Sequence, residues 1–191
     1  MAKKLESSLK NMVLSLLFIS MGMSAALGFV YVITKSPIEN SMKKAETEAI
    51  KNVLPTFDND PTTSATTIEG LVYYTATNKG NPVGCAIKTF TDKGFAGHFE
   101  IMVGFKSDGT IYKTVVLDQK ETPGLGDKMK TAWKDQFNEK NPANFKLLVK
   151  KDGGQVDAIT ASTITSRAFC DAIQKAYDGF MKNIYSDLNK I

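Results

Sequence analysis

The sequence predicts an α+β protein in which a single N-terminal transmembrane helix precedes one extracytoplasmic domain of antiparallel strands with packed helices. Three observations lead to this prediction: a long uncharged segment near the N-terminus, a series of strand-like runs separated by turn residues, and a C-terminal segment of helical periodicity. Of the 191 residues, roughly 155 follow the apolar segment, which is enough for one domain with its own core.

The apolar segment covers residues 12–33 and contains no charged side chain. At about 22 residues it is long enough to cross roughly 30 Å of hydrocarbon as a helix. Lys3, Lys4 and Lys10 precede it, and Lys35 follows it. Since positively charged flanks favour the cytoplasmic side, we expect a cytoplasmic N-terminus, a single pass through the inner (cytoplasmic) membrane, and a main domain on the extracytoplasmic, periplasmic side.

A cleaved signal peptide is the alternative for this segment, because Ser24 and Ala26 satisfy the small-residue rule for a cut after Ala26. The apolar run continues beyond that point to Ile33, which favours a retained helix. We therefore assign residues 1–35 to a cytoplasmic N-terminus and a transmembrane anchor.

The remaining chain divides into a helix with a linker and one folded domain. Residues 36–68 are predicted to contain a helix over 37–54, ended by Pro55, and then a loop rich in Asp, Thr and Pro. In the domain, 69–191, strands separated by Asn-, Asp- and Gly-containing turns are expected together with two helices. The predicted strands are 71–77, 84–90, 98–105, 111–117 and 145–149, and the first helix covers about 127–138 with Met129, Trp133 and Phe137 at four-residue spacing.

Composition and charge exclude several function classes. The formal net charge of +4 is modest and partly reflects the lysines beside the anchor, so nucleic-acid binding is not expected. One histidine, His98, and two cysteines without ligand spacing, Cys85 and Cys170, leave no site for zinc or an iron–sulfur cluster. The two thiols could form a disulfide outside the cytoplasm or remain buried and free.

The most informative stretch is residues 157–166, with the sequence DAITASTITS, which precedes the C-terminal helix. It carries five hydroxyl side chains: Thr160, Ser162, Thr163, Thr165 and Ser166. The helix itself is predicted from apolar residues at three- and four-residue steps, namely Phe169, Ile173, Ala176, Tyr177, Phe180, Ile184 and Leu188. Because the first N–H groups of a helix lack partners and its dipole is positive there, the hydroxyl segment suits a phosphate group.

Two alternatives stand beside the phosphate interpretation. A capping box with additional Ser and Thr would explain the hydroxyls structurally, although one cap requires only one of them. A nucleophilic hydroxyl would require a neighbouring base. His98 lies far away in the sequence and no G-x-S-x-G motif is present, so we do not expect a hydrolase.

A second motif, residues 121–126 with the sequence ETPGLG, lies between the fourth predicted strand and the helix at 127–138. Its Pro-Gly pair favours a type II turn, and Gly126 before Asp127 suits a tight start of a capped helix. With so little side-chain bulk, the backbone of this loop can approach a flat ligand closely, and Leu125 would be its single projecting apolar side chain. An ordinary turn is the structural alternative.

These motifs resemble those of the FMN-binding domain family. Residues 157–166 are similar to its flavinylation signature D-x-x-[ST]-G-A-T-x-T-S, residues 121–126 match its E-T-P-G-L-G loop, and residues 94–97 resemble its G-Y-x-G element. Ala161 stands where the family usually has Gly, and Ser162 where it usually has Ala. With its anchor and length, the chain also resembles the G subunits of Rnf complexes, which are membrane-bound, Na⁺- or H⁺-translocating ferredoxin:NAD oxidoreductases.

The resemblance implies a covalent flavin and a redox role. FMN would be attached through its phosphate to Thr163 by a flavin transferase, and residues 69–191 would be the FMN-binding domain. The other residues that the resemblance places around the cofactor are Thr160, Ala161, Ser162, Thr165, Ser166, Glu121, Thr122, Pro123, Gly124, Leu125 and Gly126. The chain would relay electrons between neighbouring membrane and peripheral subunits of an Rnf-type complex, with no catalytic side chain of its own.

Two other functions remain open at this point. The C subunits of Na⁺-translocating NADH:quinone reductases have the same anchor and motif, usually in a longer chain. A non-enzymatic anchored domain that caps its helix, or binds a phosphorylated ligand reversibly, would also contain these residues. The role of His98 is not assigned by either motif.

Overall fold

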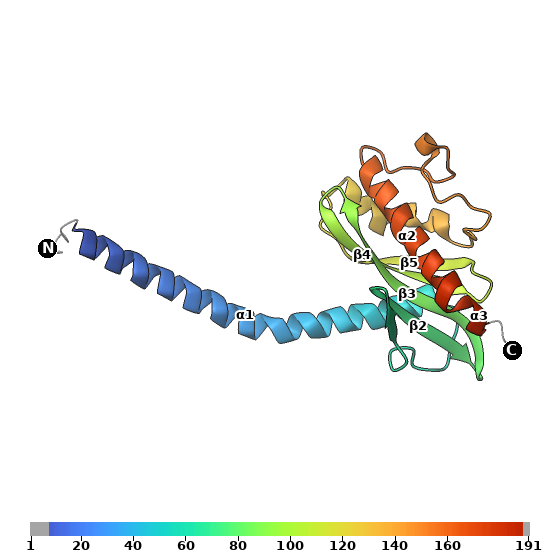
Figure 1. Ribbon diagram of the computed structural model, residues 1–191, viewed down its shortest axis with the longest axis horizontal. Helices are drawn as coiled ribbons and strands as arrows, with labels where there is room; N and C mark the ends of the chain where they lie inside the picture. Colours follow the sequence, from blue (N-terminus) through green and yellow to red (C-terminus); the bar gives the residue numbers. More distant parts are fainter. Residues whose placement is uncertain (1–7, 189–191) are drawn as a thin grey trace. The chain divides into compact units, whose positions relative to one another are not determined.

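The computed structural model describes residues 8–188 and consists of two units, Met1–Lys44 and Ala45–Ile191. Figure 1 shows a long N-terminal helix and a domain built on a twisted sheet. The predicted α+β class is confirmed by the order of elements, in which one long apolar helix precedes an antiparallel five-stranded sheet with packed helices.

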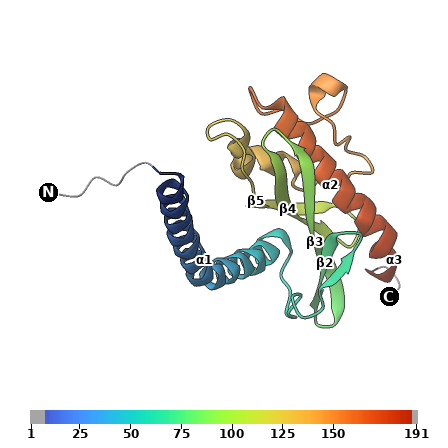
Figure 2. The same ribbon diagram turned by 60° about the vertical axis from the view of Figure 1, so that its left-hand side comes forward.

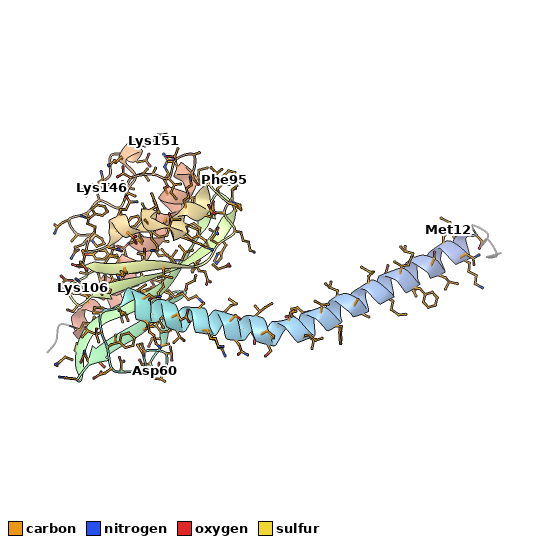
Figure 3. All side chains as sticks on the ribbon, turned by 180° about the vertical axis from the view of Figure 1, so that it is seen from behind. Met12, Asp60, Phe95, Lys106, Lys146 and Lys151 are labelled. Atoms are coloured by element: carbon orange, nitrogen blue, oxygen red, sulfur yellow. The ribbon has the colours of Figure 1, made fainter. Side chains whose placement is uncertain are left out.

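The N-terminal helix α1 extends over Leu9–Val53 and is long and apolar enough to cross a membrane. Its apolar side chains project into the surroundings, as Figure 3 shows from Met12 onward. The predicted start of a separate helix at Pro37 is wrong, because Pro37 lies inside α1. A proline removes one backbone hydrogen bond, yet the helix-forming residues on both sides continue the same helix. The predicted cytoplasmic residues Lys3 and Lys4 lie outside the described residues.

The sheet is an antiparallel meander with strand order β1-β2-β3-β4-β5. The bounds of its strands are Thr66–Ile68, Leu71–Asn78, Asn81–Gly94, Gly97–Lys106 and Ile111–Asp118. The four predicted strands of this region are therefore confirmed, and β3 extends further than expected in both directions. The short β1 falls in a segment that was expected to be a loop, since its two threonines and one isoleucine give no apolar alternation.

Helices cover both faces of the sheet, so its central strands are buried on both sides. Neighbouring residues of one strand, such as Tyr73 and Tyr74, belong to two different cores. The end of α1 packs on one face through Ala49, Ile50 and Val53. The second long helix, α2 (Thr163–Asn183), packs on the other face, and Figures 1 and 2 show it running along β3 and β4.

The predicted C-terminal helix is confirmed, and its apolar periodicity explains its position. The large core Phe169, Ile173 and Phe180 side chains are fully buried against the sheet. After Ile184 the chain turns into a short helix, α3 (Tyr185–Leu188), whose Leu188 is also buried.

Two predictions between β5 and α2 are wrong. The helix expected at 127–138 consists of two 3₁₀ helices, η1 (Gly126–Lys130) and η2 (Ala132–Phe137), because the backbone of Thr131 between them is extended. The spacing nevertheless buries Met129 and Phe137 fully, because the apolar pattern still faces the core.

The strand expected at 145–149 is also absent from this part of the chain. Val149 and Val156 form only an isolated parallel bridge, and the chain between them contains η3 (Lys150–Asp152) and a left-handed turn at Gly153. Leu147 and Val149 both point into the core, with the two-residue spacing of a strand. The chain then turns back, and within the described part of the chain no neighbouring segment pairs with these residues over more than one bridge.

Candidate functional site

A cavity of about 290 Å³ lies where three segments of the domain meet. The first segment is the β3–β4 turn, the second is the loop at 121–126, and the third is the start of α2. Its lining residues are Phe95, Glu121, Thr122, Leu125, Gly126, Ala161, Ser162, Thr163 and Ile164. The fold thus brings the two sequence motifs together from positions about 40 residues apart, which only the tertiary structure could show.

Three of the five hydroxyls are occupied by internal hydrogen bonds. The Ser162 and Thr165 hydroxyl oxygens lie 2.7 Å apart, and Thr165 donates to Oε2 of Glu121 at 2.8 Å. Ser166 donates to the carbonyl of Ser162 at 3.0 Å and accepts from the backbone N–H of Ile159 at 2.9 Å. These bonds fix the turn that leads into α2.

The capping-box alternative is wrong, because Ser162, the N-cap residue of α2, makes no side-chain capping bond. Within residues 8–188, no hydrogen bond reaches the backbone N–H groups of Thr163, Ile164 and Thr165. The first turn of α2 therefore presents unpaired donors at the positive end of the helix dipole, which is an arrangement that favours anions.

The remaining two hydroxyls, those of Thr160 and Thr163, form no hydrogen bond with any described residue. Thr160 is exposed and does not line the cavity, whereas Thr163 is partly buried and does. Among the predicted hydroxyls, Thr163 is thus the one that combines a free oxygen with a place in the cavity wall.

Ala161 has a left-handed backbone conformation, with φ of 62°. A side chain with a Cβ atom strains this conformation by roughly 1–2 kcal/mol, and glycine avoids the strain. A glycine would adopt this conformation without that strain, and this chain adopts it with an alanine.

The loop at 121–126 contains the predicted turn. Gly124 has φ of 78°, and the N–H of Leu125 donates to the carbonyl of Thr122 at 3.1 Å, as expected for a type II turn. Leu125 is 39% exposed and projects at the cavity, whereas Pro123 and Gly124 are exposed and do not line it. The expected capped helix start is wrong, because η1 begins at Gly126 without a side-chain cap.

Glu121 is buried, with 4% of its surface exposed. Its Oε1 accepts a hydrogen bond from the backbone N–H of Ala96 at 3.1 Å, and its Oε2 accepts one from Thr165 at 2.8 Å. The carboxylate thus connects the β3–β4 turn with the start of α2.

Two apolar lining residues, Phe95 and Ile164, were not among the predicted site residues. Phe95 is 68% exposed at the β3–β4 turn, where Figure 3 shows it at the edge of the domain, and Ile164 is 49% exposed in the first turn of α2. The sequence could have indicated both residues, because each is an apolar side chain within a segment that resembles a family motif. With Leu125 they give the cavity an exposed apolar rim.

A larger cavity of about 660 Å³ lies on the other side of Ile164, between α2 and residues 142–152. Apart from Ile164 it shares no lining residue with the smaller cavity. Two of its three lining cations are paired, because Arg167 binds Asp152 through two bonds of 2.7 and 2.8 Å and Lys93 lies 2.6 Å from Asp171, whereas Lys146 forms no ion pair with any described residue. Both sequence motifs line the smaller cavity, so the candidate site is the smaller one.

The other reactive side chains lie apart from the site. Cys85 and Cys170 are both free, so the disulfide alternative is wrong. Both are buried, and burial raises the pKa of each thiol to about 12. His98 lies on β4 with Nδ1 2.7 Å from Oδ1 of Asp92, which raises the pKa of the imidazole. It contacts none of the hydroxyls in the α2 motif. No group of metal-ligating side chains occurs among the described residues.

Comparison with known proteins identifies the same region. The model of the FMN-binding domain family matches residues 94–178. The chain is 38% identical over 128 residues to the G subunit of the ion-translocating oxidoreductase complex of Pseudoalteromonas atlantica, covering 61% of this chain and 59% of that protein. It is 31% identical over 194 aligned positions to the G subunit of the Na⁺-translocating ferredoxin:NAD⁺ oxidoreductase complex of Acetobacterium woodii, covering 93% and 91%.

The crystal structure of Shewanella oneidensis NqrC resembles this fold with a TM-score of 0.51 at 20% identity, covering 73% of this chain and 70% of that one. This likeness concerns the fold alone. The chain spans 59%, 51% and 55% of the length of the first three curated relatives that it matches. Across most of its length it matches the Acetobacterium woodii protein. The chain belongs to the family of G subunits of ion-translocating oxidoreductase complexes and contains an FMN-binding domain.

Proposed function

We propose that this chain is the covalent-FMN electron-transfer subunit of an Rnf-type complex, a membrane-bound, ion-translocating ferredoxin:NAD oxidoreductase. The FMN phosphate would be esterified to the hydroxyl of Thr163. The observation that carries this proposal is the state of that hydroxyl, which lines the cavity at the start of α2 and is free of hydrogen bonds to the described residues.

The donor set of the site fits a phosphate ester. The unpaired N–H groups of the first α2 turn can donate to phosphate oxygens, and the helix dipole contributes about 0.3–2 kcal/mol to an anion held there. Ser162 and Thr165 bond to each other, and Thr165 also bonds to Glu121. Their hydroxyls therefore stabilise the turn before α2 and are not expected to compete with Thr163 as sites of the phosphoester.

The apolar rim fits a flat ring system. The cavity of about 290 Å³ is at the lower limit of typical cofactor pockets, roughly 300–1,000 Å³. A ring between Phe95, Leu125 and Ile164 would therefore keep one edge at the surface. Bound FMN supplies electron-transfer chemistry, and these side chains would orient it and exclude water from its faces. No side chain is required as an acid, a base or a hydride acceptor.

A tether has a physical advantage outside the cytoplasm. Attachment makes cofactor binding intramolecular, so occupancy does not depend on free FMN on that side of the membrane. We place the N-terminus in the cytoplasm and residues 69–191 on the other side, from the lysines that flank the apolar part of α1. A flavin transferase would install the cofactor, and other subunits of the complex would donate and accept the electrons.

The C subunit of a Na⁺-translocating NADH:quinone reductase remains the second candidate, and its support is the resemblance of the anchor and of the hydroxyl motif at residues 157–166. The match to the Acetobacterium woodii G subunit, which covers most of both chains, favours the first. Proteins that co-purify with the chain distinguish the two complexes.

Intact-mass measurement of the purified full-length chain tests the proposal. We expect an added mass equal to esterified FMN in the native chain and in T67V, and its absence in T163V. Thr67 is the matched control, because it is an exposed threonine on β1, outside both motifs and outside the cavity. A reversible phosphate-binding domain would show no added mass in any of the three and no fluorescent band on a denaturing gel.

A further inference from the structure

The carboxylate of Glu121 lies at the centre of the three segments that form the cavity. It accepts from the backbone of Ala96 in the β3–β4 turn and from the side chain of Thr165 in α2, at 3.1 and 2.8 Å. Its own backbone begins the loop that carries Leu125. One buried side chain thus links all three walls, next to the apolar residue that each contributes.

Two glycines make room for this carboxylate. A Cβ atom at Gly94 would lie 2.5 Å from the backbone oxygen of Gly97 and 2.6 Å from Oε1 of Glu121, and one at Gly126 would lie 2.5 Å from Oε2. A side chain at either position would therefore have to displace the carboxylate from the place where it makes its bonds. Gly94 comes from the β3–β4 turn and Gly126 from the loop, so two of the three walls fit closely around the same group.

The hydrogen-bond chain from Glu121 has a fixed direction. An ionised carboxylate only accepts, so Thr165 must donate to it, and the oxygen of Thr165 is then available to accept from Ser162. Ser162 is the N-cap residue, and a serine there normally caps the first-turn N–H groups. Its bond to Thr165 replaces that cap, which is not formed.

We propose that Glu121 is a positioning residue that, through Thr165 and Ser162, keeps the N-terminus of α2 uncapped and available for a phosphate while it holds the β3–β4 turn in place. The phosphate part of this inference rests on the proposed function. The positioning part concerns only bonds within the chain. Glu121 therefore acts on the cofactor site through its neighbours, in contrast to the direct contact that the sequence motif implied.

Amide hydrogen exchange of the full-length chain in detergent tests the positioning part without any flavin. The parent is T163V, which keeps the shape of Thr163 and removes the ester acceptor. In T163V/E121M, exchange of the Ala96 amide should accelerate at least about tenfold, since a hydrogen bond to a charged group is lost. In T163V/E121Q it should stay near the parent value, because Gln can accept from Ala96 and still bond Thr165. E48M is the matched control, since Glu48 is exposed on α1 and outside the cavity.

The variant T165V separates the two bonds of Glu121, and it changes the shape of the site little because Val and Thr are nearly isosteric. In T163V/T165V, exchange of the Ala96 amide should remain at the parent value, whereas exchange of the Ile164 amide should slow, because the released Ser162 caps the first turn of α2. With Thr163 intact, T165V and E121M should carry severalfold less covalent flavin than the native chain, and E121Q should restore it.

The positioning role would be overturned if exchange of the Ala96 amide were unchanged in T163V/E121M. It would also be overturned if the T165V substitution changed neither the flavin content nor the amide exchange of the first turn of α2. If E121M does not fold, T165V alone decides. A native chain without flavin mass would refute the proposed function and leave the exchange results as a valid test of the Glu121 bonds.

Discussion

The phenol of Tyr73 on β2 lies directly against the bare Cα of Gly179 on α2. A Cβ atom at Gly179 would come within 2.4 Å of the Tyr73 oxygen, which also accepts a hydrogen bond from Asn183 at 3.1 Å. This contact sets how closely α2 approaches the sheet, and so it helps to position the start of the same helix at the cavity.

We predict that G179A destabilises the domain by roughly 1–3 kcal/mol, because the added methyl group overpacks a buried contact. Urea unfolding of the full-length chain measures the change. G28A is the control, because a Cβ at Gly28 meets nothing within 4 Å. Equal stability of G179A and G28A would contradict the close packing of Tyr73 against α2.

At Ala161, which has a left-handed backbone conformation, we predict that a substitution stabilises the domain. A161G should stabilise the domain by up to about 1 kcal/mol, since relief of strain exceeds the greater entropy of glycine in the unfolded chain. A168G, in the buried interior of α2, should instead destabilise the domain. Thermal unfolding of the two variants should therefore shift in opposite directions, and a loss of stability in A161G would show that the backbone there is not strained.

Alkaline pH should weaken the fold through its buried thiols. Burial raises the pKa of Cys85 and Cys170 from 9.0 to about 12, so between these values the native state keeps protons that the unfolded chain has lost. The free energy of unfolding must then fall as pH rises above 9.0. Chemical unfolding at several alkaline pH values measures this slope, and C85A/C170A should reduce it. Both thiols should also resist alkylation until the chain unfolds.

His98 should titrate above the usual range of histidine because of Asp92. The hydrogen bond to Asp92 raises the pKa of the imidazole, and the D92N substitution should lower it. NMR titration of the single histidine measures both values. Since the raised pKa stabilises the folded form only while His98 is protonated, this small contribution is lost as pH rises through the folded pKa. An unchanged pKa in D92N would show that the pair does not form.

Much of this fold could be predicted from local sequence patterns, whereas the arrangement of the site residues could be seen only in the tertiary structure. Alternating residues in β2 to β5 and the helical spacing of Phe169, Ile173 and Phe180 predict the sheet and its covering helix. The spacing of Met129 and Phe137 predicted one helix at 127–138, whereas the chain forms two 3₁₀ helices that still bury both side chains. Periodicity alone does not distinguish the two helix types.

The bond between Thr165 and Glu121 joins residues 44 positions apart, and no local pattern encodes it. The motifs indicated which residues gather at the site. They could not indicate which hydroxyls are occupied by internal bonds, because that depends on how the loop at 121–126 meets α2.

Peptide mass spectrometry of the native chain tests the central claim most directly. Cleavage after Lys151 and Arg167 releases residues 152–167, a peptide that contains all five hydroxyls of the motif. Fragmentation should place one esterified FMN on Thr163, with Thr160, Ser162, Thr165 and Ser166 unmodified. An unmodified peptide, or a flavin located on any other hydroxyl, would contradict the account.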